Sequence, residues 1–309
     1  MTERANDSVR VGNVNVSRVL VAAGRQAIPC RAAVRHLKRM MRPYEDDENS
    51  EYCITNGLSQ IAALRNAGID VRGKELLEFG TGWVPLIPWL FHLAGAGKLI
   101  LTDIEHLMDQ QTIERARRTV KRRIKDIAET LQEPESSLIP KIEGQMTFEY
   151  LVPWDAAAQP DESVDLVISR AVFEHVPVAQ LQFFLQQFHR ILREGGAMAH
   201  VVDNSDHWEH RDHHLSRINF LRFDEHDMFW RLAQFNPQSF QNRLRHDDYV
   251  SLIERAGFHV DAALGEPDQQ CLKDARSIAI NARFAGKTTA NLAILTSLFV
   301  ARKTNLPAD

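Results

Sequence analysis

Apolar residues follow two alternating patterns along this chain. Short, mainly apolar runs typical of buried strands occur at Glu75–Phe79, Lys98–Asp103, Ser163–Ser169 and Ala197–Val202. Between them, apolar positions recur every three or four residues, which is the spacing of helices. Strands that are apolar on both faces and alternate with helices form parallel sheets covered on both sides. The pattern therefore predicts an α/β fold with a doubly wound, Rossmann-like sheet.

Weaker patterns supply the remaining elements. A third strand is expected at Met146–Val152, and the last two strands at Phe258–Leu264 and Leu292–Lys303, which makes a seven-stranded, mostly parallel sheet. Gly195-Gly196 is expected to end a helix before the fifth strand. The expected helices are Ser50–Ala67, Val84–Leu93, Ile104–Leu131, Gln180–Leu192 and Asp247–Ala256.

Two segments depart from this alternation. Residues 31–42 mix Arg and Lys with apolar residues at helical spacing, and residues 1–60 are interpreted as an N-terminal helical cap on a main domain of residues 61–309. Residues 204–249 are crowded with His, Arg, Asp and aromatic side chains. We interpret them as an insertion after strand five, on the substrate side.

Composition limits the classes of partner. The formal net charge of -4 and the pI of about 6.4 lack the basic excess that binds phosphate backbones, so we expect no nucleic-acid partner. The three cysteines are widely spaced and indicate neither a disulfide framework nor a cysteine metal site. The apolar run at residues 19–24 is too short for a signal peptide or a membrane span. We therefore expect a cytoplasmic protein without membrane insertion, and the sequence leaves a homodimer open.

The first expected strand leads into Glu78-Phe-Gly-Thr-Gly82, directly before a helix. Glycines at such a turn let the backbone approach a ligand, and free N–H groups at the start of a helix attract a carboxylate. A dinucleotide-binding turn has a third glycine where this chain has Pro85, which disfavours NAD. Asp103 ends the second strand, where a carboxylate can accept hydrogen bonds from ribose hydroxyls. Glu78 favours a zwitterionic ligand with a cationic group over a pyrophosphate.

These motifs, with Val164–Val176 and Leu192-Arg-Glu-Gly-Gly-Ala197, resemble the ordered motifs of class I S-adenosylmethionine-dependent methyltransferases with a type 11-like domain. The resemblance covers roughly residues 70–203 and implies a seventh strand that runs antiparallel, a methyltransferase domain at residues 61–309, and S-adenosyl-L-methionine as cofactor. It assigns the methionine portion to the glycine turn and the ribose to Asp103. The cofactor-binding residues that it implies are Glu78, Phe79, Gly80, Thr81, Gly82, Asp103, Ile104, Trp154, Asp155, Ser169, Arg170 and Ala171.

Candidates for acid–base chemistry follow the fourth and fifth strands. Methyl transfer is an in-line displacement that depends mainly on positioning, with a base when the acceptor is a hydroxyl. His207 is the first choice of base, with Asp206 nearby, and His175 is the second, because both histidines follow the carboxyl ends of strands. A structural His175 and solvated loop histidines are the alternatives. We expect no metal site, although the histidine and aspartate spacing after strand five is also compatible with one, through Asp203, His207, His210, His213 and His214.

The sequence thus favours an enzyme that transfers a methyl group from S-adenosylmethionine to a small-molecule acceptor, such as a hydroxyl of a metabolite or glycosylated compound. A macromolecule-directed methyltransferase is one alternative. However, Ser169-Arg-Ala-Val172 follows strand four, in place of the Asn-Pro-Pro-Tyr type of turn that similar families use on exocyclic amines of bases. A non-catalytic, cofactor-binding relative is the other alternative, because a fold does not fix a function.

Overall fold

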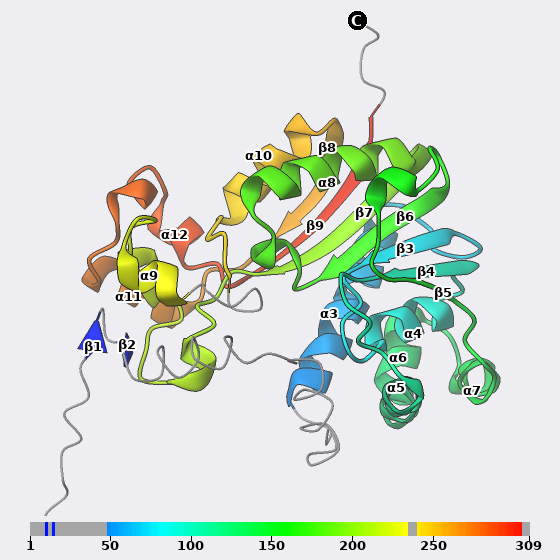
Figure 1. Cartoon of the computed structure of the whole chain (residues 1–309). Helices are drawn as coiled ribbons and strands as arrows, with labels where there is room; N and C mark the ends of the chain where they lie inside the picture. Colours follow the sequence, from blue (N-terminus) through cyan, green and yellow to red (C-terminus); the bar gives the residue numbers. More distant parts are fainter. Residues whose placement is uncertain (1–9, 12–13, 16–47, 234–239, 305–309) are drawn as a thin grey trace, which may run out of the picture.

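A seven-stranded sheet forms the centre of the molecule (Figure 1). The computed structural model describes residues 10–11, 14–15, 48–233 and 240–304. The strand order is β5-β4-β3-β6-β7-β9-β8, and β9 runs antiparallel to both of its neighbours. The predicted doubly wound, mostly parallel sheet with an antiparallel last strand is confirmed. The strands are β3 (Glu75–Phe79), β4 (Lys98–Thr102), β5 (Glu149–Leu151), β6 (Val164–Arg170), β7 (Leu192–Asp203), β8 (Phe258–Leu264) and β9 (Thr296–Lys303).

Helices cover both faces of this sheet because the strands are apolar on both sides (Figure 1). One apolar core lies between the sheet and α3 (Glu48–Asn66), α4 (Leu86–Leu93), α5 (Gln110–Arg122), α6 (Ile124–Leu131) and α7 (Glu135–Glu143). A second core lies on the opposite face, under α8 (Val178–Ile191) and α10 (His246–Arg255). No helix in the described part of the chain has the length and apolar composition needed to cross a membrane.

A third apolar core lies beside the sheet rather than on it. We call the residues that form it the side module, which comprises residues 204–233 and 265–295. The module contains α9 (Met228–Ala233), α11 (Gln269–Ser277) and α12 (Thr289–Leu292), and Figure 1 shows these helices gathered at one end of the sheet. The second segment was expected to contain only the start of the last strand. It lies between β8 and β9 and packs against the predicted insertion.

Several expected elements differ in the structure. The helix expected at residues 104–131 is two helices, α5 and α6, and the turn at Arg123 separates them. β7 begins at Leu192, not Ala197, because Gly195 adopts φ +70 within it and a bulge there restores pairing with β6. The expected helix over residues 31–42 lies outside the described residues. α3 runs across residue 60, and the division into a cap and a main domain stays a prediction.

Arg245 joins the side module to the sheet. Its guanidinium is completely buried and donates hydrogen bonds to the backbone carbonyls of Asn204, Leu292 and Ile294, at 2.7 to 2.8 Å. Asn204 follows β7, and the other two residues precede β9. Burial lowers the pKa of this arginine to about 10, which still leaves it charged at neutral pH. One side chain therefore satisfies three carbonyls from two distant segments.

Replacement of Arg245 by Met is expected to lower the free energy of unfolding by about 2–4 kcal/mol, because it leaves buried carbonyls without donors. Urea denaturation measures the change. Arg255→Met, at the other end of α10, is the control, since Arg255 is exposed and should change the free energy by less than about 0.5 kcal/mol. Equal losses in the two variants would contradict the role given to Arg245.

Candidate functional site

The turn after β3 lies at a topological switch point of the sheet. β4 pairs with β3 on one side and β6 pairs with it on the other, and open α/β sheets bind ligands beside such a point, at the carboxyl ends of the strands. Gly80 and Gly82 have φ values of +78 and +73, which favour glycine. A Cβ on Gly80 would lie 2.6 Å from Val172 Cγ2, whereas a Cβ on Gly82 would meet nothing within 4 Å. The backbone of Gly82 therefore faces open space.

Glu78 is a buried acid beside this turn. Its side chain belongs to β3, only 2% of the residue is exposed, and burial, with a smaller contribution from the Asp103 charge, raises its pKa to about 8. Its Oε2 has no hydrogen-bond partner among the described residues. A buried carboxylate oxygen without a donor is costly unless a ligand supplies one. The ammonium group of a methionine portion has the charge and the N–H donors that this position lacks.

Asp103 is held in place by backbone donors. Its Oδ2 accepts a hydrogen bond from the Gly82 N–H at 2.8 Å, and its Oδ1 accepts one from the Ile104 N–H at 2.7 Å. The carboxylate is thus fixed at the end of β4, where the ribose contact is predicted. Ile104 is 78% exposed beside it, an unusual exposure for a large apolar side chain. An apolar surface next to a ribose site suits the face of a base.

The backbone amides of the glycine turn are paired with the end of β4 and with Asp103. The Gly80 and Thr81 N–H groups both donate to the Thr102 carbonyl, at 3.0 and 2.9 Å, and the Gly82 N–H donates to Asp103. These three amides are therefore committed to β4. The free N–H groups expected to attract a carboxylate are those at the start of the helix, which is α4 at Leu86, and that contact stays a prediction.

The predicted residues after β5 lie beside the same turn. The backbone N–H of Trp154 donates to the Asp103 carbonyl at 3.0 Å. The Trp154 ring contacts the buried ring of Phe79 at a centroid distance of 5.8 Å. Asp155 is exposed and accepts a hydrogen bond from the Ala157 N–H at 3.0 Å. Phe79 and Trp154 therefore support Asp103 from within the core, and only Asp155 extends to solvent.

The end of β6 also borders the turn. The Ser169 hydroxyl is buried and shares a 2.8 Å hydrogen bond with His200 Nδ1, so this side chain is already paired inside the sheet. The Arg170 guanidinium lies over the Tyr52 ring at 4.9 Å. Ala171 has φ +54, which is unfavourable for alanine and occurs often at functional sites. The predicted contacts of Ser169, Arg170 and Ala171 with a cofactor stay predictions.

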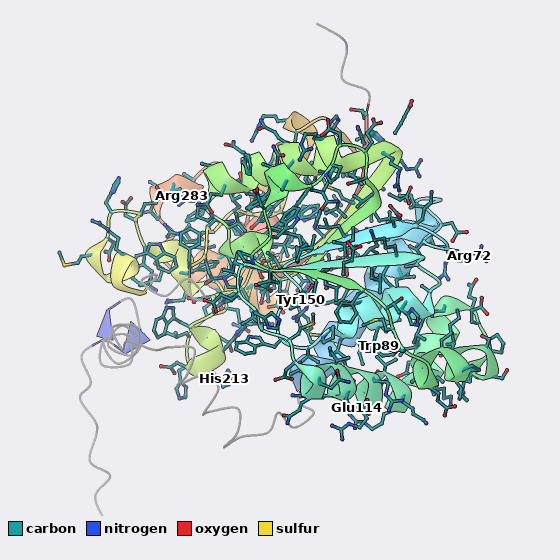
Figure 2. All side chains as sticks on the ribbon, turned by 45° about the vertical axis from the view of Figure 1, so that its right-hand side comes forward. Arg72, Trp89, Glu114, Tyr150, His213 and Arg283 are labelled. Atoms are coloured by element: carbon teal, nitrogen blue, oxygen red, sulfur yellow. The ribbon has the colours of Figure 1, made fainter. Side chains whose placement is uncertain are left out.

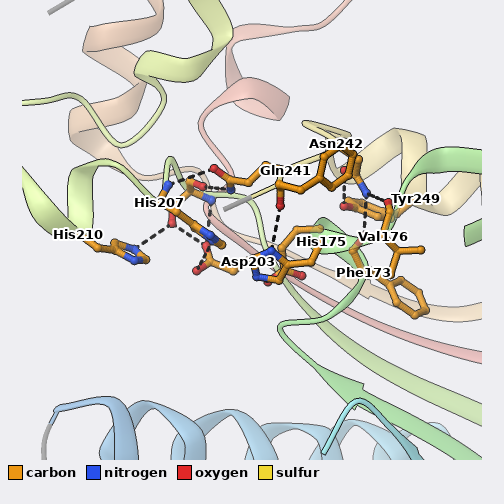
Figure 3. Close-up of polar contacts among 12 residues, drawn as sticks. Phe173, His175, Val176, Asp203, His207, His210, Gln241, Asn242 and Tyr249 are labelled. Atoms are coloured by element: carbon orange, nitrogen blue, oxygen red, sulfur yellow. Dashed lines mark hydrogen bonds and ion pairs between the residues drawn. The ribbon is translucent and has the colours of Figure 1, made fainter. Parts of the chain in front are cut away.

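The two candidate histidines come together from different strand ends (Figure 3). His175 ends a short 3-10 helix after β6, and His207 follows β7. Their ring centroids are 4.9 Å apart. Asp203, the last residue of β7, lies with its Oδ2 3.5 Å from His207 Nε2. The expected convergence of chemistry-bearing residues at this edge of the sheet is therefore present.

The two histidines differ in charge preference. Burial and the neighbouring His207 lower the pKa of His175 to about 4, and its Nδ1–H donates to the Phe240 carbonyl at 2.9 Å. His175 is thus neutral at pH 7, with its Nε2 lone pair unprotonated. Burial lowers the pKa of His207, but its close contact and charge interaction with Asp203, together with the charges of Glu174 and Asp206, outweigh burial and raise it overall. The same interaction, with hydrogen bonds from Ser205, overcomes burial and lowers the pKa of Asp203 to about 2.

The carboxylate beside His207 belongs to Asp203 and not, as expected, to Asp206. Asp206 is 1% exposed, and its Oδ1 accepts a hydrogen bond from the Trp208 N–H at 2.8 Å. Burial raises its pKa to about 7. It shapes the turn that carries His207, because its own N–H also donates to the Arg217 carbonyl at 2.7 Å.

The remaining histidines of this segment diverge from the pair. His210 is exposed, although its ring stacks on that of His207 at 5.2 Å. His214 is exposed as well, and His213 lies at the surface, where it pairs with Glu209 at 3.0 Å (Figure 2). The sequence spacing therefore does not describe one cluster of five groups.

Two consecutive polar residues that the sequence did not single out hold the histidine loops together (Figure 3). Gln241 accepts a hydrogen bond from the His207 N–H at 3.1 Å and donates to the Ser205 carbonyl at 2.7 Å. Asn242 donates to the carbonyls of Phe173 and Val176 at 2.7 and 3.0 Å. Only a three-dimensional contact reveals these roles, because Gln and Asn before a helix are ordinary loop residues.

The chain matches a family model described as a methyltransferase domain over residues 57–263, which is well over half of its length. The chain belongs to this family. It is a methyltransferase that depends on S-adenosylmethionine, and the unpaired Glu78 oxygen, the open space at Gly82 and the fixed Asp103 carboxylate fit that cofactor. No curated protein matches the sequence.

Solved structures similar to this methyltransferase include two S-adenosylmethionine-dependent methyltransferases. The one from Mesorhizobium loti is 15% identical with a TM-score of 0.45, and the match covers 80% of this chain and 100% of that chain. The one from Methanosarcina mazei is 17% identical with a TM-score of 0.45, and the match covers 79% of this chain and 97% of that chain.

Replacement of Asp103 by Asn is expected to weaken binding of S-adenosylmethionine at least tenfold. Hydrogen bonds to a charged group contribute about 1.5–3 kcal/mol each, and the amide has only one acceptor oxygen. Calorimetric titration of the methyltransferase with the cofactor measures the dissociation constant. Asp70→Asn is the control, because Asp70 is exposed before β3 and pairs only with Arg72 in the described structure. Unchanged affinity in Asp103→Asn would remove Asp103 from the site.

Proposed function

We propose that this methyltransferase methylates a hydroxyl oxygen of a small-molecule acceptor, such as a metabolite or a glycosylated compound. The observation that carries the proposal is the pairing of His207 with Asp203, beside His175 and at the same edge of the sheet as the glycine turn. A hydroxyl must lose its proton as it is methylated, and a histidine oriented by a carboxylate is suited to that task.

The residues of the site divide the work between positioning and proton removal. Bound S-adenosylmethionine supplies a methyl carbon on a sulfonium; as the acceptor oxygen bonds to that carbon, the carbon–sulfur bond breaks and its electron pair stays on sulfur. Glu78 and Asp103 would hold the methionine portion and the ribose, on either side of the sulfonium, which fixes the direction of transfer. His207 would take the hydroxyl proton, and Asp203 would stabilise the resulting imidazolium. Gln241 fixes the backbone of His207 and so the position of its ring.

Two features support a small acceptor. The side module follows β7 directly and carries His207 near its start, so it is positioned to enclose an acceptor next to the histidines. The net charge of -4 gives the protein no general attraction to nucleic acid. The widely spaced cysteines fit a reducing compartment, and we propose the cytoplasm on that basis.

Replacement of His207 by Gln is expected to lower the turnover number by about 10²–10⁴-fold, the usual contribution of a general base. The Gln amide can still donate to Asp203, so affinity for S-adenosylmethionine should stay within about twofold. Formation of S-adenosylhomocysteine with a panel of hydroxyl-bearing small molecules identifies the acceptor and then measures turnover. His213→Gln is the matched control in the same segment, because its ring is exposed.

Two results would count against the proposal. Wild-type turnover with nucleic acid or protein, and with no small molecule of the panel, would favour the macromolecular alternative. Full turnover by His207→Gln would show that the proton leaves without this histidine.

A further inference from the structure

Glu174, His175 and His207 form a group that the proposed chemistry uses only in part. Each residue offers one donor atom, and these three atoms lie within 4.8 Å of one another. Glu174 and His175 follow β6, whereas His207 follows β7. The group is therefore assembled by the fold at the carboxyl edge of the sheet, and sequence spacing alone does not reveal it.

Glu174 is the least explained member of the group. Only 2% of it is exposed, and neither carboxylate oxygen has a hydrogen-bond partner in the described part of the chain. Its Oε1 lies 4.0 Å from His175 Nε2, so the carboxylate is directed at the histidines. Its backbone is fixed, because its carbonyl accepts a hydrogen bond from the Asn242 N–H at 2.9 Å. A buried carboxylate is costly unless a cation or several donors compensate it.

The two histidines are held as metal-binding histidines usually are. A ligand histidine commonly donates one ring N–H to a carbonyl or a carboxylate, which orients the other nitrogen toward the metal. His175 donates its Nδ1–H to the Phe240 carbonyl and keeps the Nε2 lone pair on the side of Glu174. His207 lies beside the Asp203 carboxylate. The His175 ring therefore already has the supporting acceptor of a metal ligand, and the His207 ring has a carboxylate near its Nε2.

We propose that Glu174, His175 and His207 bind one divalent transition-metal ion at the carboxyl ends of β6 and β7. Two imidazoles and one carboxylate suit Zn²⁺ or Mn²⁺, whereas Mg²⁺ prefers oxygen ligands. Bonds of about 2.1 Å in a tetrahedral site place the ligand atoms roughly 3.4 Å apart, so a small rotation of the side chains closes the group around an ion. Three protein ligands leave at least one position for an oxygen of another molecule.

The ion would also assist the proposed methyl transfer. A hydroxyl oxygen that binds a divalent cation loses its proton more readily. In the metal-bound enzyme both histidines would be ligands of the ion, so His207 would not take the proton itself. Direct proton transfer to His207 would then occur only in the metal-free enzyme. This use of the site rests on the proposed function, but binding of the ion does not, because it needs neither cofactor nor acceptor.

The test is a calorimetric titration of the full chain, first stripped with a chelator, with Zn²⁺, Mn²⁺ and Mg²⁺ salts separately. Glu174→Gln keeps the shape of the side chain and removes the ionisable ligand oxygen, so the metal-free variant should melt at the same temperature as wild type or higher. His175→Asn removes the Nε2 ligand, while its amide can still donate to the Phe240 carbonyl. The control replaces the exposed His213 and His214 together by Asn.

We expect the wild-type chain to bind one Zn²⁺ or Mn²⁺ ion and not to bind Mg²⁺. The affinity for the ion should be at least about 100-fold lower in Glu174→Gln and in His175→Asn, and unchanged in the control. Asp203→Asn should weaken binding about 10–100-fold, as loss of a supporting acceptor does. Absence of Zn²⁺ and Mn²⁺ binding by the wild-type chain would overturn the proposal. Undiminished binding by Glu174→Gln would also overturn it, because the ion would then lie elsewhere. Neither result would affect the proposed methyl transfer to a hydroxyl.

Discussion

The burial of both faces of the parallel sheet is the constraint on which the rest of this structure depends. The strands contribute apolar side chains to two cores, one on each face. Most polar chemistry is therefore displaced to the ends of the strands, where the chain turns and the backbone is not covered. Glu78, Asp103, Glu174 and Asp203 all lie at or just beyond the carboxyl end of a strand. The site is thus a consequence of how the sheet is covered, and four acidic groups share one edge because their strands are parallel neighbours.

The side module modifies this edge without disturbing the sheet. Its own apolar core lets two long connections pack on each other, and Arg245 ties them to the residues that flank β7 and β9. A charged side chain is an expensive choice for such a junction, but it satisfies three carbonyls that an apolar residue would leave unpaired. The module, which carries His207 near its start, therefore has a fixed position relative to the sheet.

The sequence predicted those features that depend on local pattern. The strand from Glu75 to Phe79 and the glycine turn could be predicted from the sequence, because a buried strand and a positive φ each restrict the residue types locally. Contacts between distant segments could not be predicted in this way. The choice of Asp203 rather than Asp206 as the partner of His207 depends on which way a turn directs two carboxylates of the same segment. Gln241 acts through contacts with the loop after β7, 34 and 36 residues away, and Asn242 through contacts with the loop after β6, 69 and 66 residues away.

Glu78 and Glu174 are buried in the same way, in two parts of one site. Each is 2% exposed, each has a pKa raised to about 8 mainly by burial, and each has a carboxylate oxygen without a partner in the described structure. Asp206 is as buried and its Oδ2 also lacks a partner among the described residues, but the hydrogen bond from the Trp208 N–H to its Oδ1 explains its position as part of a turn. A folded protein retains a buried carboxyl group without partners only where the surrounding structure over-determines its position, and groups with such raised pKa values gather at functional sites. At Glu78 the predicted compensating group is the ammonium of the cofactor. By the same reasoning, Glu174 marks a second place in the methyltransferase where positive charge is missing, on the acceptor side of the site.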